Sequence, residues 1–172
     1  NKVLTKVLEQ TRWDKGHLAL IAELYHNNHK ELGTAKAIQL NQHLADLGDA
    51  EAQARLANLY LDAQDEHKDP IQAFKYASLS AKQKNPRGLS LLLAMYLAGD
   101  MSDSDLLDEV ITELDVLSKN GSAVSAFTLA RFYKDGSKYI QQDKHLFMEY
   151  LSRAAKLGFM PAIDEMKKIP KN

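Results

Sequence analysis

The chain lacks several features that would otherwise define its chemistry. Its 172 residues contain no cysteine, which excludes disulfides, thiolate zinc sites and cysteine nucleophiles. The formal net charge is −1, so the chain generates no overall field that would attract nucleic acid or an anionic membrane. The most apolar stretch, 89–98, is about half as long as the roughly eighteen residues needed to span a bilayer. We therefore expect no nucleic-acid partner and no direct membrane insertion.

The motifs of common catalytic and metal sites are also missing. The sequence contains no HExxH, no GxSxG and no glycine loop that would hold a phosphate. His26 and His29 have the spacing of a ligand pair, and Glu23 or Glu31 is near enough in sequence to add a ligand. No second histidine pair supports such a metal site, and solvated loop histidines are the commoner state. We expect no catalytic residue, no cofactor and no metal.

A pattern that returns about every thirty-six residues is the most informative feature of the sequence. One position is held by the small residues Ala52, Gly88, Ser125 and Ala162. Eight residues beyond the first three of them are Tyr60, Tyr96 and Tyr133, and Tyr25 extends the tyrosine series backwards. Such a period is typical of arrays of small units, each of which buries its apolar face against the next. It favours a binding scaffold over an enzyme.

Each repeat contains two apolar stripes with helical spacing, which predicts a pair of helices. Ala52, Leu56 and Leu59 fall on one helix face, and Ala73 and Ala77 belong to a second stripe. Small residues in these stripes allow two helix backbones to approach closely. The sequence therefore predicts helical hairpins stacked on one another.

Residues that start and stop helices agree with this division. Asp69-Pro70 and Asn85-Pro86 place a capping side chain before a proline, and Ser102 with Asp105 resembles a capping box. Glycines that would end helices are Gly48, Gly99, Gly121, Gly136 and Gly158. The predicted repeats cover approximately 13–47, 48–83, 84–120 and 121–157, with a flanking helix in 1–12 and a partial repeat at 158–169.

We predict one all-α domain over 1–172. It would be a right-handed α/α superhelical solenoid of about four antiparallel helix pairs plus partial end helices. The ragged ends lead us to expect one segment of a longer solenoid. The start at Asn1 rather than methionine suggests a trimmed or processed chain that has lost any targeting segment. Trp13 lies where the first repeat begins, and we expect it to cap that end by packing.

The repeat resembles the Sel-one-like repeat, a branch of the tetratricopeptide-like α/α solenoids. That family has small-x-x-x-Leu-Gly/Ala-x-Leu-Tyr-x-x-Gly, a loop, then Asp and Ala-x-x-Trp/Tyr-x-x-x-Ala-Ala before a closing Gly. The matching residues are Ala52, Leu56, Ala57, Leu59, Tyr60, Asp69, Ala73, Tyr76 and Ala81 in one repeat and Ser125, Leu129, Ala130, Phe132, Tyr133, Gly136, Asp143, Tyr150, Ala154, Ala155 and Gly158 in another. Leu93 in the Gly/Ala position and the loss of the alanine pattern in 103–119 depart from the family, so we expect irregular packing there.

The resemblance implies a fold and a mode of action rather than catalytic residues. Members of the family typically act as adaptors in protein complexes, and many bacterial members work in the cell envelope or are exported. We therefore expect a bacterial source and favour the periplasm or export over the cytoplasm. The chain's partner is expected to be a protein or peptide.

Residues between the motif positions on the first helix of each pair are the candidate binding residues. In regular helices they point away from the core of the pair, toward the predicted concave face. The candidates are Arg55, Asn58, Leu61, Leu91, Leu97, Thr128, Arg131 and Lys134. Their leucines would form an apolar patch with the basic residues at its rim, which suits an amphipathic helix or an extended segment with acidic side chains. In the alternative, Leu91 and Leu97 are buried by neighbouring repeats or by the N-terminal helix.

Three functions follow from these observations. The first is a non-enzymatic adaptor that binds a protein through the concave face. The second is a structural solenoid that associates with itself through exposed terminal repeats. The third is a hydrolase acting on the cell envelope, which would need a polar cleft with perturbed acids.

Overall fold

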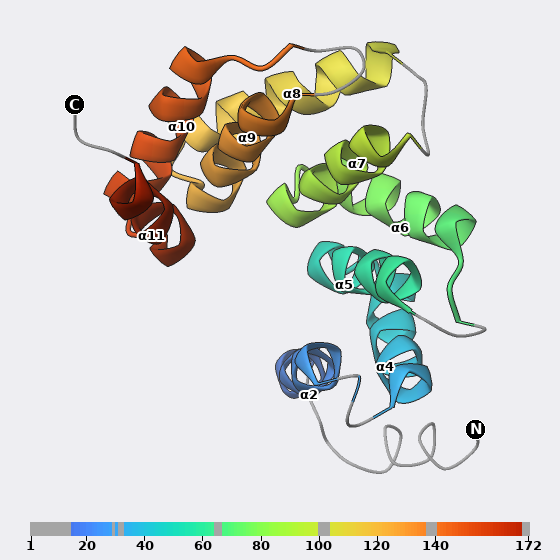
Figure 1. Cartoon of the computed structure of the whole chain (residues 1–172). Coiled ribbons are helices and arrows are strands. Elements are labelled where there is room, and N and C mark those ends of the chain that lie inside the picture. Colours follow the sequence, from blue (N-terminus) through green and yellow to red (C-terminus); the bar gives the residue numbers. More distant parts are fainter. Residues whose placement is uncertain are drawn as a thin grey trace. The chain divides into compact units, whose positions relative to one another are not determined.

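The computed structural model describes residues 15–28, 30, 33–63, 67–99, 104–136 and 141–169 (Figure 1). Within these ranges the chain forms nine α-helices and no strand. The helices are α2 (Lys15–Asn27), α4 (Thr34–Asp46), α5 (Ala50–Asp62), α6 (Pro70–Lys82), α7 (Pro86–Ala98), α8 (Ser104–Lys119), α9 (Ala123–Asp135), α10 (Lys144–Lys156) and α11 (Met160–Lys168). The all-α class expected from the sequence is confirmed.

Four sequence predictions concern residues outside these ranges. They are the flanking helix of 1–12, the capping role of Trp13, the solvated loop state of His29 and the capping box at Ser102. The handedness of the solenoid and its treatment as one domain also remain predictions.

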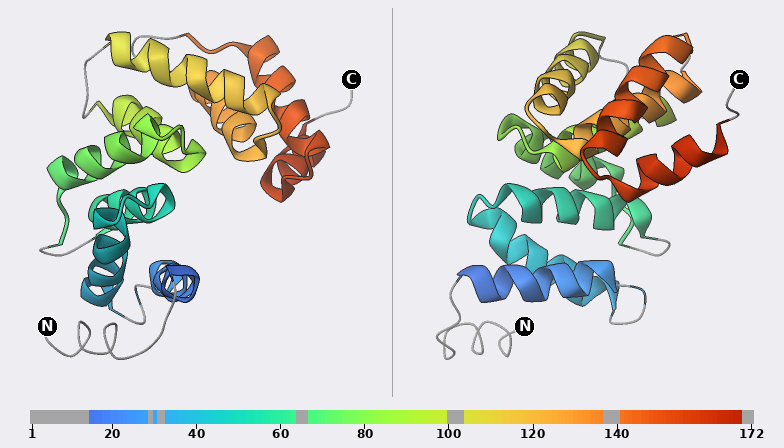
Figure 2. Two further views of the ribbon diagram at one scale, coloured as in Figure 1. Left: turned by 180° about the vertical axis from the view of Figure 1, so that it is seen from behind. Right: turned by 90° about the vertical axis from the view of Figure 1, so that its left-hand side faces the viewer.

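The chain divides into two compact regions, Asn1–Tyr76 and Ala77–Asn172, which we call the N-terminal and C-terminal regions. In the N-terminal region α4 packs on both α2 and α5, and α2 also contacts α5. In the C-terminal region each helix from α7 to α11 packs on the next, and α7 contacts α9 (Figures 1 and 2). The first helices of consecutive hairpins, α2 and α5 in one region and α7 and α9 in the other, therefore contact each other as well as their own partners. Stacking of hairpins requires such contacts.

Side chains hold the beginnings of five helices. Each capping oxygen accepts hydrogen bonds from backbone amides in the first turn, which satisfies donors that have no partner inside the helix. The capping residues are Asp49 on α5, Asp69 on α6, Asn85 on α7, Ser122 on α9 and Asp143 on α10. The caps predicted at Asp69 and Asn85 are thereby confirmed.

The second helix of every pair ends in the same turn. One residue there has a positive φ, and the values are 82° at Gly48, 58° at Lys84, 97° at Gly121 and 82° at Gly158. At α6, the amide of Lys84 donates to the carbonyl of Ala81 at 2.7 Å, and the amide of Asn85 donates to that of Ser80 at 3.2 Å. Lys84 thus adopts a left-handed conformation that glycine adopts more easily.

The small residue at the repeated position of α7 is required by its contact with α6. A Cβ added to Gly88 would lie 2.6 Å from the Cβ of Ser80 and 2.8 Å from the backbone nitrogen of Ala81. These distances are shorter than atomic contacts allow, so the two helices approach at a point where only a hydrogen fits. The repeated small position therefore sets how closely consecutive hairpins pack.

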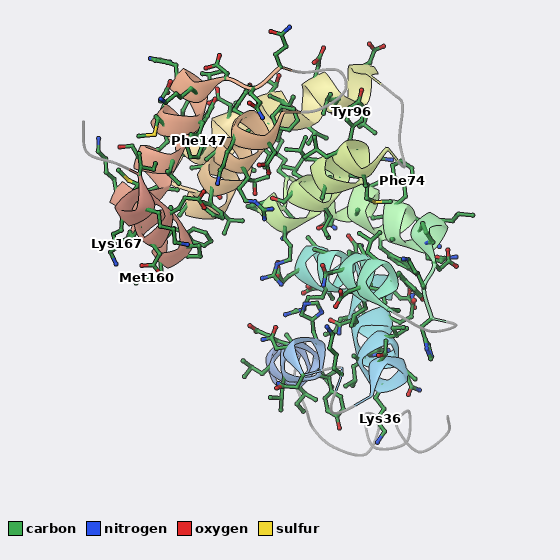
Figure 3. The ribbon with its side chains drawn as sticks, in the orientation of Figure 1. Lys36, Phe74, Tyr96, Phe147, Met160 and Lys167 are labelled. Atoms are coloured by element: carbon green, nitrogen blue, oxygen red, sulfur yellow. The ribbon has the colours of Figure 1, made fainter. Side chains whose placement is uncertain are left out.

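Paired tyrosines join the two helices of a hairpin. The rings of Tyr60 and Tyr76 stack with centroids 6.2 Å apart and an interplanar angle of 14°, and those of Tyr133 and Tyr150 stack at 5.8 Å and 5°. Tyr96, on α7, has no tyrosine opposite it on α8, which also lacks the alanine pattern (Figure 3). Leucines occupy this position instead.

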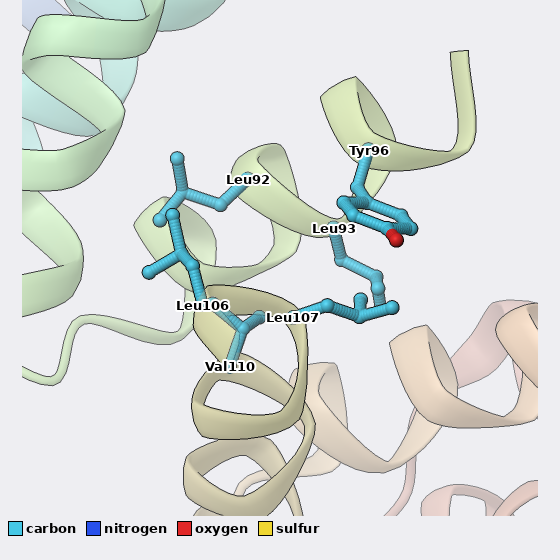
Figure 4. A pocket seen from close by; sticks show the side chains of 6 residues that line it. All are labelled: Leu92, Leu93, Tyr96, Leu106, Leu107 and Val110. Carbon is cyan, nitrogen blue, oxygen red and sulfur yellow. The ribbon is translucent and has the colours of Figure 1, made fainter. Parts of the chain in front are cut away.

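The contact between α7 and α8 is a narrow apolar hollow. Its lining residues are Leu92, Leu93, Tyr96, Leu106, Leu107 and Val110 (Figure 4). It has no room for a water molecule, so it is part of the packed core and not a ligand site.

Candidate functional site

An open cleft of about 220 Å³ lies between α7 and α9 in the C-terminal region. Its lining residues are Ser90, Leu93, Ala94 and Leu97 from α7 and Phe127, Thr128, Arg131, Phe132 and Asp135 from α9. Leu93 and Phe132 are buried and form the floor, whereas Ala94 and Arg131 are exposed at the sides. The volume is below the range of roughly 300–1,000 Å³ typical of small-molecule sites, and it suits one or two inserted side chains.

Two hydroxyls in the lining of the cleft are bonded to each other. Oγ of Ser90 lies 2.8 Å from Oγ1 of Thr128 and also donates to the carbonyl of Pro86 at 2.7 Å. The single Ser90 proton is used on that carbonyl, so Thr128 donates to Ser90. These bonds satisfy both hydroxyls within the protein, and neither bond is to a base that would activate a nucleophile.

Two opposite charges line the remainder of the rim. Arg131 is exposed and forms no ion pair or hydrogen bond with any residue in the described ranges. Asp135 follows it one helical turn later, at a spacing of about 6 Å along the helix. The cleft therefore offers an unpaired cation beside its apolar floor and a carboxylate at the end farther from Thr128.

The cleft exists because two repeat-equivalent positions carry short side chains. Between α2 and α5 these positions hold Glu23 and Arg55, whose Oε2 and Nη1 atoms lie 3.7 Å apart. Between α7 and α9 the same positions hold Ala94 and Thr128. A long charged pair fills the space between first helices in the N-terminal region, whereas the short pair leaves it open in the C-terminal region.

Arg55 does not lie at an exposed rim, so that part of the sequence prediction was wrong. The residue is only 3% exposed, and its Nε donates to Oδ1 of Asn41 at 3.2 Å. Asn41 is itself buried and donates to the carbonyls of Ala22 and Ala37. The repeat pattern gave the direction of the Arg55 side chain correctly, but α2 packs against α5 there and covers it.

Lys134 is held by a neighbouring helix instead of facing the cleft. Its Nζ forms an ion pair with Oε1 of Glu165 on α11 and lies 5.8 Å from the ring centroid of Phe147 on α10. Lys134 therefore links α9 to both following helices. This contact satisfies its charge within the chain.

The other candidates are divided between the two regions. Leu97 is 37% exposed and lines the cleft, so it is brought together with Thr128 and Arg131. Leu91 is half-buried and does not line the cleft. Asn58 and Leu61 are half-buried on α5, in the N-terminal region. Binding of a partner by any of these residues remains a prediction.

Six lining residues were not among the sequence candidates. They are Ser90, Leu93, Ala94, Phe127, Phe132 and Asp135. The signal that could have found the cleft is the contrast between the Glu23–Arg55 pair and the Ala94–Thr128 pair at equivalent positions. Comparison of those positions points to open space between α7 and α9, each of which is the first helix of its hairpin.

A polar network connects α8 and α10 away from the cleft. The hydroxyl of Tyr150 and the side chains of Lys119 and Arg153 all contact the carboxylate of Asp115. Burial and then the hydrogen bond to Asp115 raise the pKa of Tyr150 well above its usual value. Burial alone would raise the pKa of Asp115, but hydrogen bonds from Lys119 and Tyr150 and the nearby cations lower it overall. The network ties consecutive second helices together.

The described part of the chain contains no cluster of three or more His, Cys, Asp or Glu side chains able to hold a metal ion. No helix in it is both long enough and apolar enough to cross a membrane. Neither finding adds a second candidate site.

Comparison with known proteins identifies the fold. No protein family and no curated protein matches the chain. Among solved structures, it is similar to a protective antigen of uropathogenic Escherichia coli strains described as displaying an SLR fold, with a TM-score of 0.67 and 20% identity over 92% of this chain. It is also similar to a Sel1 repeat protein from Oxalobacter formigenes, with a TM-score of 0.64 and 18% identity over 87% of this chain. The chain spans 33% of the first protein and 60% of the second.

Proposed function

From its Sel1-like repeat fold, we propose that this chain is a non-enzymatic adaptor of bacterial origin that binds a protein partner through the face of its first helices. The contact would be centred on the α7–α9 cleft, within a face predicted to be concave. One observation carries the proposal: an open apolar cleft lies beside Arg131, a cation that has no partner in the described residues.

The chemistry of the cleft is that of an interface anchor. Binding energy in protein interfaces is concentrated where an apolar or aromatic side chain enters a pocket and excludes water. Leu93 and Phe132 supply such a floor, and the exposed Leu97 extends it to the surface. A partner that covers Leu97 and fills the cleft gains burial at about 25 cal/mol for each Å² of apolar surface.

A catalytic role is supported by nothing in the cleft. Its only acidic side chain is Asp135, whereas general acid–base hydrolysis uses two groups with different pKa values. The hydroxyls of Ser90 and Thr128 bond to each other and to a carbonyl, not to a base. We therefore favour binding over hydrolysis.

Site-specific photocross-linking in extracts of the native host tests this proposal. A photoreactive residue at Ala94, which is exposed in the cleft, is compared with one at Val116, which is 42% exposed on α8. We expect a discrete cross-linked protein from position 94 only, and we expect Leu97→Asp in the same chain to abolish it. Identical products from both positions, or products that persist in Leu97→Asp, would contradict the proposal.

Self-association is the second candidate, because α2 exposes two leucines one turn apart. Leu20 is 67% exposed and Leu24 is 55% exposed. Such a face on a first helix resembles a stacking surface without its neighbour. Light scattering over a concentration series separates the two functions, since only self-association raises the mass with concentration.

A further inference from the structure

We propose that the α7–α9 cleft recognises a protein segment in which one large apolar side chain is accompanied by a single carboxylate that pairs with Arg131. This inference rests on the proposed function and specifies the chemistry of the partner. It follows from how the chain itself fills the equivalent spaces between its other first helices.

Elsewhere in the protein, a glutamate from one first helix meets a cation on its neighbour. Glu23 of α2 pairs with Arg55 of α5, and Glu165 of α11 pairs with Lys134 of α9. Between α7 and α9 the cation is present as Arg131, but no carboxylate of α7 lies opposite it. Arg131 stands at the repeat position of Glu23 and not at that of Arg55 or Lys134, so a partner's carboxylate here would reproduce the chemistry of those contacts and not their position in the repeat.

The remainder of the cleft is lined by apolar side chains and suits an apolar group. Leu93, Leu97, Phe127 and Phe132 surround the space, and its volume of about 220 Å³ is enough for one large side chain. The hydroxyls of Ser90 and Thr128 already bond within the chain, so they do not require a polar group from the partner. An inserted leucine, methionine or phenylalanine would leave no buried donor unpaired.

Asp135 limits the partner to one acidic group and sets its orientation. Its carboxylate lies one turn beyond Arg131, away from Thr128. A second carboxylate near Asp135 would be repelled, whereas one placed between Arg131 and Thr128 would not. The partner's acidic side chain is therefore expected at the Thr128 end, and runs of acidic residues are disfavoured.

The same features exclude nucleic acid as the occupant. Stable binding to a phosphate backbone uses several lysine or arginine contacts, whose number sets the salt dependence. The cleft has one unpaired cation, an apolar floor and a carboxylate. Charge and polarity at this point match a protein segment.

The test is selection of peptides from a random display library on the folded full-length chain. The counter-selection variant, Ala94→Glu/Thr128→Arg, installs in the cleft the pair that fills the equivalent space between α2 and α5. If circular dichroism shows that the double variant does not fold, Ala94→Phe replaces it as the counter-selection variant, because it fills the same space from an exposed position. We expect enriched peptides that bind wild type at least about tenfold more tightly than either filled variant.

The sequences of those peptides decide the inference. We expect an apolar residue accompanied by one Asp or Glu, and we expect selection on Arg131→Glu to replace the acid with Lys or Arg. Asp135→Asn should accept peptides with a second acid. Peptides that need the open cleft but show no acidic preference would overturn the inference and leave the proposed function standing. Peptides that bind the filled variants equally well would overturn both.

Discussion

The hydroxyl of Tyr150 donates a hydrogen bond of 2.8 Å to Oδ1 of Asp115, which lies 35 residues earlier in the chain. The N-terminal region contains a counterpart in which Nε2 of Gln42 donates at 2.7 Å to the hydroxyl of Tyr76, 34 residues later. In both cases a tyrosine of one second helix bonds to the second helix of the preceding pair. This aromatic position of the repeat therefore joins consecutive repeats as well as the two helices of one hairpin.

Tyr150 should contribute stability that depends on pH. Its pKa is raised in the folded chain, so its contribution is present below its ordinary value of about 10 and is lost as the pH rises above it. We expect Tyr150→Phe to lower the free energy of unfolding at neutral pH by about 1 kcal/mol, since the bond to Asp115 is lost. The variant should also lose less stability than wild type above pH 10. Urea unfolding over a pH series measures both effects.

The matched control is Tyr76→Phe, which removes a hydrogen bond to the neutral amide of Gln42 rather than to a carboxylate. If Tyr150→Phe and wild type lose the same stability in alkali, the titration of Tyr150 does not contribute to the pH dependence of folding.

Gly88→Ala should destabilise the protein although alanine is the better helix former. Propensity alone predicts a gain of about 1 kcal/mol from this change within α7. The added Cβ would meet Ser80 and the backbone of Ala81 at distances that force α6 and α7 apart, which costs about 1–3 kcal/mol. We therefore expect a net loss in thermal unfolding experiments.

Ser80→Gly combined with Gly88→Ala provides the control, because it removes the side-chain half of the clash and should recover part of the loss. A single Gly88→Ala variant that is more stable than wild type would show that the helices do not approach as closely as the structure indicates.

Lys84→Gly should stabilise the turn between α6 and α7. A left-handed conformation costs a residue with a Cβ about 1 kcal/mol, and glycine avoids that cost. The change also removes the ion pair between Lys84 and Glu113, but the lysine is largely exposed and such pairs contribute little. We expect a gain of up to about 1 kcal/mol by chemical denaturation. Lys84→Ala loses the same ion pair and keeps the strain, so it should show no gain.

Much of the fold could be predicted because local chemistry determines it. Asp69 and Asn85 cap the helices that their sequences predict, and the tyrosines of the repeat occupy consistent positions. Small residues such as Gly88 marked the close contacts between hairpins. These features depend on a few neighbouring residues and on a period that the sequence displays directly.

The candidate site was predicted less well because it depends on pairs of residues from different repeats. Whether Arg55 faces solvent is decided by Glu23 and Asn41 on two other helices. Whether Lys134 is available is decided by Glu165, thirty-one positions later. A repeat pattern gives the direction in which a side chain leaves its own helix. The length and charge of the facing side chain then determine whether that direction is open.

Arg55 should therefore matter for stability and not for binding. Arg55→Met keeps the apolar stem but leaves Oδ1 of the buried Asn41 without its donor, which we expect to cost about 1–3 kcal/mol. Cross-linking from Ala94 in the folded variant should equal that of wild type. A variant with normal stability and lost cross-linking would restore Arg55 as a binding residue.

Leu97 and Leu91 offer a final matched pair on α7. Leu97 lines the cleft and is 37% exposed, so an aspartate there remains hydrated and should change the free energy of unfolding by less than about 1 kcal/mol. The same substitution at the half-buried Leu91 removes packed surface and should cost about 1–3 kcal/mol. Partner binding should be lost in Leu97→Asp and retained by the folded fraction of Leu91→Asp, as measured by capture from host extract alongside circular dichroism. The reverse result would move the binding surface away from the cleft, toward the side of α7 on which Leu91 lies.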